Sequence, residues 1–261
     1  MKKFIMIIAF IAIHSSAYFQ QAAPPIVTSI LDNISEIKGF TGNNFHVNSL
    51  DILNVYGLKF STSKRVEGTA FFSNEWNWGF IKIDNGIVID SVRLRYNTLY
   101  KELHFLDRES EYSLNDYFIE FGFTIMDKET KNKILFRNGF PAFDKNNTKT
   151  NYQILAGNEY KLLKLTIKEL QENTALDGQT YNRITEKNSY YIYNSLDSTM
   201  VKVRMGVQQL LVDFPGLKEQ IATICSKENL KCKSESDLIT LFSNIITPTS
   251  ALGEPETKKP F

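Results

Sequence analysis

Histidine and cysteine are scarce in this chain of 261 residues, which has three of the first and two of the second. The sequence also contains no G-x-S-x-G, G-x-x-x-x-G-K or H-E-x-x-H motif. These are the patterns of a serine-hydrolase elbow, a phosphate-binding loop and a zinc-protease helix. The sequence therefore predicts no catalytic residue, no cofactor and no metal site.

Neither sign of charge is in excess, because 30 Lys and Arg residues balance 29 Asp and Glu residues. Nucleic acids and anionic membranes attract strongly basic proteins, so no nucleic-acid partner is expected. After the first residues, no apolar stretch reaches the roughly 20 residues that a membrane-spanning helix needs. We therefore expect no transmembrane helix in the mature chain.

The longest apolar run lies at the N-terminus. Lys2 and Lys3 precede ten apolar residues, Phe4–Ile13, and small side chains lead to Ala17. A basic start, a short apolar run and a small-residue end are the three parts of a secretory signal peptide. The alternative is a buried N-terminal helix. We predict that residues 1–17 are a cleavable signal peptide and that the mature protein is periplasmic or extracellular.

Apolar and polar side chains alternate with a period of two in the middle of the chain. Within residues 92–96, three apolar side chains alternate with Arg93 and Arg95, which is typical of a strand with one buried face. Asn85-Gly86 lies between two such runs and indicates a hairpin turn. Short turns without long helices predict an antiparallel sheet of roughly eight to ten strands over residues 68–205.

The remaining segments have other patterns. Residues 18–67 are expected to be helical or irregular, and residues 206–246 have apolar side chains three and four apart, which predicts a helical hairpin. Ser234 is placed to cap its second helix. Residues 247–261 are predicted to be disordered. The expected fold is mainly β, an antiparallel sheet resembling a sandwich or an open barrel, and α+β overall.

Cys225 and Cys232 are the only cysteines. A bridge between them would close a loop of eight residues, worth about 2–2.5 kcal/mol of stability. Because an exported chain meets an oxidising environment, we predict a disulfide. Two unpaired thiols are the alternative.

Two pairs of residues are candidates for binding. Trp76 and Trp78 are two apart, so on a strand they share one face. Exposed, they would form a shelf that stacks on sugar rings or grips a peptide, although their size favours a place in the core. Arg93 and Arg95 also share a face. They could bind an anion, although surface ion pairs with Glu102 or Asp90 are the favoured interpretation.

The mature chain has two histidines, His46 and His104. We expect His104 on the solvent face of a strand rather than in a catalytic role. Acids such as Asp84, Asp90 and Glu120 are expected on solvated strand faces. Glycoside cleavage needs only two carboxyl groups near each other, so an acid-based enzyme stays open.

The block L-R-Y-N-x-x-x-x-E-L-x-F begins at Leu94 and ends at Phe105. It resembles a family of uncharacterised exported proteins from Gram-negative bacteria, and the resemblance extends over residues 66–245. It implies an exported, β-rich domain and brings no activity or catalytic residue with it.

The sequence thus predicts an exported, non-enzymatic protein that binds a partner in the bacterial cell envelope or serves as a structural part of it. An envelope protein or a glycan would be that partner. The alternative is a periplasmic or secreted hydrolase that uses acidic residues. A second alternative is an outer-membrane β-barrel.

Overall fold

The computed structural model describes residues 57–59, 64–84, 86–107, 110–114, 118–127 and 130–246. The predicted signal peptide, residues 18–56 with His46, and the predicted disordered tail lie outside these residues. Within the described ranges, no helix is both long enough and apolar enough to span a membrane.

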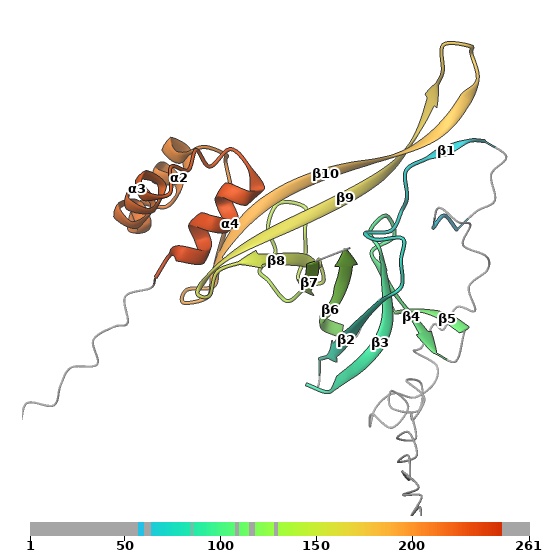
Figure 1. Ribbon diagram of the computed structural model, residues 1–261, viewed down its shortest axis with the longest axis horizontal. Coiled ribbons are helices and arrows are strands. Elements are labelled where there is room, and N and C mark those ends of the chain that lie inside the picture. Colours follow the sequence, from blue (N-terminus) through green and yellow to red (C-terminus); the bar gives the residue numbers. More distant parts are fainter. Residues whose placement is uncertain are drawn as a thin grey trace, which may run out of the picture.

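A sheet of eleven strands makes up about half of the described chain (Figure 1). The strands are hydrogen-bonded in the order β1-β10-β9-β8-β7-β6-β2-β3-β4-β5, and β11 pairs with β10. Their pairing is antiparallel apart from β1 with β10, so the sheet is mixed. The bounds are β1 Val66–Glu67, β2 Asn77–Ile83, β3 Val88–Asn97, β4 Glu102–Asp107, β5 Ser110–Leu114, β6 Phe118–Asp127, β7 Thr130–Arg137, β8 Tyr152–Ala156, β9 Tyr160–Thr174, β10 Thr180–Asn194 and β11 Thr199–Lys202.

The period-two alternation is confirmed in β3. Val92, Leu94 and Tyr96 are buried, whereas Arg93 on the opposite face is exposed. The predicted hairpin is also present, because β2 and β3 are consecutive antiparallel partners. These strands form because each can bury one row of apolar side chains while its backbone groups pair with its neighbours.

The sheet curves round its inner face and encloses a hydrophobic core. Side chains from β2 to β7 form this core, including Phe105 of β4 and Phe121 of β6. Tyr96 of β3 and Phe136 of β7 have ring centroids 5.1 Å apart, although β2 and β6 lie between their strands in the sheet. The sheet is not closed and ends at β1 and β5. The fold is therefore the predicted mainly β, α+β class, with the curvature of an open barrel.

Strands β9 and β10 form a long ribbon that projects beyond the rest of the sheet (Figure 1). Each strand has 15 residues. The projecting part, near residues 168–187, is mostly polar, and its few apolar side chains, such as Leu170 and Ile184, are only half-buried, so it has little alternation to detect. Leu176 at its tip is fully exposed.

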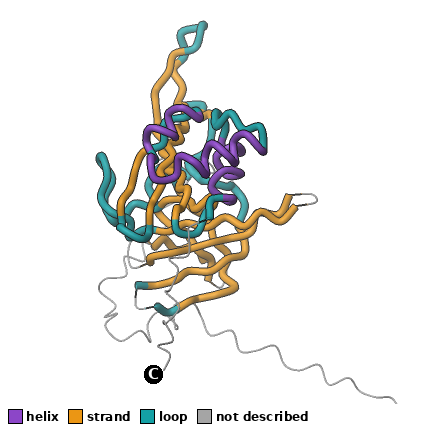
Figure 2. The backbone as a smooth tube through the Cα atoms, turned by 90° about the vertical axis from the view of Figure 1, so that its left-hand side faces the viewer, coloured by secondary structure: helices purple, strands orange, loops and turns teal. Residues whose placement is uncertain are grey.

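The C-terminal helices pack against one face of the opposite end of this ribbon (Figures 1 and 2). The sequence predicted two helices within residues 206–246, whereas the structure has three α-helices and one 3-10 turn in that range. Ser234 caps the last helix as predicted, because its Oγ accepts a hydrogen bond of 3.1 Å from the Asp237 N–H. The elements are α2 Val207–Asp213, η1 Pro215–Leu217, α3 Lys218–Lys227 and α4 Glu235–Asn244.

Candidate functional site

The outer face of the curved sheet has a groove of about 540 Å³ over β2, β6 and β7. Trp78 and Phe80 of β2 and Leu135 of β7 supply its apolar walls, and Gly122 of β6 lies between them. Such a concave surface with few polar groups is typical of a binding site. The polar lining residues are Asp90, Ser91, Glu120, Thr124 and Lys133.

Gly122 forms the floor of the groove. Gly122 is the cross-strand partner of Phe80. A Cβ atom on Gly122 would lie 2.8 Å from the Phe80 ring, which is closer than two carbon atoms approach. The aromatic ring can therefore lie against the backbone of β6, because the partner residue has no side chain.

A β-bulge in β3 directs polar groups into the same groove. Gly79 pairs with Val92 but Ile81 pairs with Ile89, so β3 has one extra residue there. Asp90 and Ser91 occupy this bulge, and Ser91 has a φ of 57°. Oδ1 of Asp90 accepts a 2.7 Å hydrogen bond from the Ser91 N–H. Bulges re-aim side chains in this way next to functional sites.

Trp78 is 62% exposed, so the favoured prediction that it belongs to the core is wrong. No described residue covers the outer face of β2 at this position. The Arg93 guanidinium, from the paired residue of β3, lies 5.9 Å from the centre of the indole. Trp76 is half-buried, and the Arg95 guanidinium lies 4.5 Å from its ring. The two tryptophans therefore have different environments.

Arg95 is engaged on several sides. Its guanidinium carbon lies 3.7 Å from the centre of the Phe71 ring, and one terminal nitrogen donates a 2.8 Å hydrogen bond to Glu111 Oε1. Its acidic partner is therefore Glu111 and not Glu102 or Asp90. Because these contacts fix the guanidinium, Arg95 is a poor candidate for an anion-binding site.

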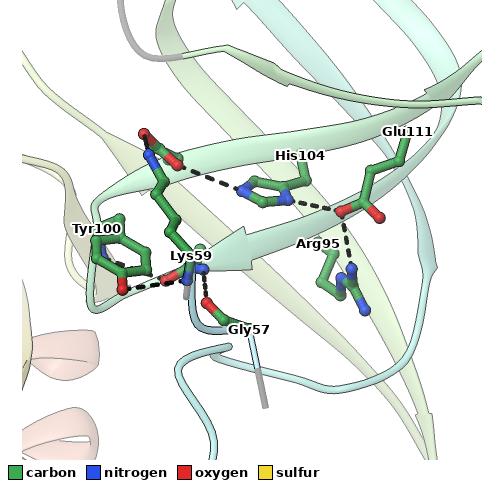
Figure 3. A network of polar contacts seen from close by, with 8 residues as sticks. Gly57, Lys59, Arg95, Tyr100, His104 and Glu111 are labelled. Carbon is green, nitrogen blue, oxygen red and sulfur yellow. Dashed lines mark hydrogen bonds and ion pairs between the residues drawn. The ribbon is translucent and has the colours of Figure 1, made fainter. Parts of the chain in front are cut away.

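His104 lies in a polar network on the outer face of β4 (Figure 3). Its Nδ1 is 2.7 Å from Glu111 Oε1, and its Nε2 is 3.7 Å from Glu102 Oε2. Nζ of Lys59 lies 2.5 Å from Glu102 Oε1. The imidazole has no exposed surface, so the prediction of a solvent-facing histidine is wrong.

The covering segment explains this error. His104 does point to the outer face of its strand, as a partner of Arg95 across the β3–β4 ladder. Phe71 lies above it, with ring centroids 5.7 Å apart and the rings nearly perpendicular. Asn97 Nδ2 donates a 2.9 Å hydrogen bond to the Gly57 carbonyl and holds residues 57–59 against the same face. Chain from outside the sheet therefore buries this part of a face that alternation assigns to solvent.

The electrostatics of the network favour its charged forms. Burial alone would lower the pKa of His104, but the interactions with Glu102 and Glu111 outweigh it, so the pKa is raised above 6.5. Burial alone would raise the pKa of both carboxyl groups. His104 and Lys59 lower that of Glu102, and His104 and Arg95 lower that of Glu111, so both lie below 4.5.

This network is not arranged for catalysis. A general base must come within hydrogen-bond reach of its substrate, and His104 is completely buried. Its Nε2 has no hydrogen bond in the described part of the chain. No group of three or more His, Cys, Asp or Glu side chains among the described residues could hold a metal ion. Within the described residues, the side chains of the network therefore contact one another across β3, β4 and β5.

The thiols of Cys225 and Cys232 are both free and buried, and their Sγ atoms are 3.4 Å apart. A disulfide requires about 2.05 Å, so the predicted bridge is absent from the structure. Burial and the neighbouring thiol raise the pKa of Cys232 to about 12. Cys225 lies near the end of α3 and Cys232 lies in the segment before α4, so the two thiols bring these parts of the chain into contact.

The sequence reasoning identified Trp78 but missed the groove around it. A signal was present, because Ile134, Leu135 and Phe136 are three consecutive apolar residues near the end of a strand whose other residues are polar. The middle one must point away from the core and towards the outer face.

Comparison of the chain with protein-family models, with curated proteins and with solved structures finds no match.

Proposed function

We propose that this is an exported, non-enzymatic protein of the bacterial cell envelope that binds a ligand in the groove beside Trp78. The exposed indole of Trp78 is the observation that carries this proposal. Most large aromatic side chains of the sheet lie in its inner core, whereas Trp78 stands 62% exposed at the wall of a groove. Exposed aromatic residues at concave surfaces are typical binding anchors.

Export through the N-terminal signal peptide and a periplasmic or extracellular location are part of this proposal. So is the resemblance to exported Gram-negative proteins, which assigns no activity. The sequence pattern of residues 1–17 supports the export route. Because no known protein matches the chain, the proposed binding function depends on the groove.

The acid-based hydrolase is a second candidate because Asp90 and Glu120 both line the groove. Glycosidases use two carboxyl groups, one of them a general acid with a raised pKa. The exposed indole of Trp78 at the wall of the same groove is typical of a binding site, so it favours binding without turnover.

Co-sedimentation with envelope fragments of the source organism tests the proposal. We expect the mature protein to sediment with the fragments and Trp78→Ala to remain in the supernatant. Val212→Ala is the matched control, because Val212 is 69% exposed on α2 and lies away from the groove. Equal retention of wild type and Trp78→Ala, or release of cleaved envelope material, would contradict the proposal.

A further inference from the structure

Building on the proposed function, we propose that the ligand of the groove is a carbohydrate, with a pyranose ring stacked on Trp78. This choice depends on three properties of the groove, which are its aromatic wall, its polar rim and the pairing of the strands beneath it. Each distinguishes a sugar from an extended peptide.

The aromatic wall suits the apolar face of a sugar ring. A pyranose has C–H groups on one face and hydroxyl groups around its rim. The face of an indole ring carries partial negative charge and so attracts these polarised C–H groups. Trp78 offers most of its surface, and Phe80 extends the wall on the same face of β2.

The polar residues at the rim of the groove can accept hydrogen bonds from hydroxyl groups and can also donate hydrogen bonds to them. Carboxylates only accept hydrogen bonds, an ammonium group only donates them, and hydroxyl groups do both. Glu120 and Lys133 form no ion pair within the described residues, so both charges are available at the groove. Asp90 uses Oδ1 for its neighbour's N–H, and its second oxygen can accept a bond from a ligand hydroxyl.

Strand pairing argues against a peptide. An extended peptide gains most of its affinity by adding a strand to a free sheet edge. Trp78, Phe80 and Gly122 belong to β2 and β6, and each of these two strands is paired on both sides. Within the described residues, positions 130–135 of β7 pair only with β6. A ring stacked on Trp78 therefore lies over side chains of doubly paired strands, with β6 between it and the edge of β7. The rim also carries both signs of charge, so it does not select a highly charged polymer.

Titration of the mature protein with cellotetraose and with N-acetylchitotetraose tests the inference. Calorimetry and tryptophan fluorescence should show saturable binding of at least one of them. Trp78→Ala should weaken that binding about tenfold or more, and Trp78→Phe, which keeps an aromatic face, should weaken it less. Glu120→Gln should reduce the affinity, and Val212→Ala should leave it unchanged.

The two proposals can fail separately. If envelope fragments are retained through Trp78 but neither oligosaccharide nor any glycan of an array binds, the carbohydrate inference is wrong and the binding function remains. A peptide that binds wild type but not Trp78→Ala would also overturn the carbohydrate inference. If an oligosaccharide binds through Trp78 and is cut, the ligand class is supported and the non-enzymatic function is wrong.

Discussion

At the scale of single residues, the network around His104 brings charged side chains together where they are partly or fully removed from water. Removing charges from water is costly unless each is paired. Glu111 lies between two positive partners, His104 and Arg95. Glu102 accepts a hydrogen bond from the ammonium group of Lys59. The same contacts hold the strands β3, β4 and β5 to the segment that contains Lys59.

The network predicts a stability maximum at mildly acidic pH. The folded pKa of His104 is raised above 6.5, so its stabilising effect is complete below pH 6.5 and is lost as the pH rises through the folded value. Glu102 and Glu111 have lowered pKa values, so their effect is present above pH 4.5 and is lost on further acidification. Urea unfolding between pH 3 and pH 9 should show both declines.

His104→Gln provides the control for the alkaline decline. The difference in unfolding free energy between wild type and this variant should shrink as the pH rises above 6.5. The full sequence has only three histidines, so an NMR titration can assign the imidazole directly. A pKa of His104 at or below 6.5 would show that the carboxylates do not stabilise its charge.

At the scale of elements, a polar contact fixes α4 to the ribbon. Glu235 lies in the first turn of α4, where a negative charge also suits the helix dipole. Its Oε2 accepts a 2.7 Å hydrogen bond from the Tyr190 hydroxyl of β10 and lies 2.8 Å from Lys164 Nζ of β9. The helix is thus tied to both strands on which it packs.

Tyr190→Phe should reduce the free energy of unfolding by about 0.5–1.5 kcal/mol, because it removes one of the two partners of Glu235. Chemical denaturation followed by circular dichroism measures the change. Tyr160→Phe is the matched control, since Tyr160 packs in the same cluster and its hydroxyl has no partner in the described chain. An equal loss in both variants would assign the effect to packing and not to the Glu235 contact.

At the scale of the whole molecule, N-terminal sequencing and intact-mass measurement of the exported protein test the export route and the state of the two cysteines. Protein purified from the compartment outside the cytoplasm should begin at Tyr18, as N-terminal sequencing would show. Its intact mass should be the same with and without reductant, because the thiols of Cys225 and Cys232 are free in the structure. An N-terminus at Met1 would contradict the export route, and a mass two hydrogens lower without reductant would contradict the free thiols.

How far the sequence predicted the fold depends on how local the signal was. The alternation in β3 and the cap at Ser234 involve residues within a few positions of each other, and both predictions hold. The projecting ribbon was only partly predicted, because its strands pair through backbone groups and bury almost no side chains at the tip. Helix α2 was missed because it is short and has no side-chain cap.

The sequence alone determined which face of each strand a side chain takes, because side-chain direction follows from the period of two. It did not determine whether that face meets water. Trp78 and His104 both point outwards, yet Trp78 is exposed and His104 is completely buried. The tertiary structure decided this, since Phe71 and residues 57–59 lie across the sheet over His104 and not over Trp78, through contacts between residues far apart in the chain.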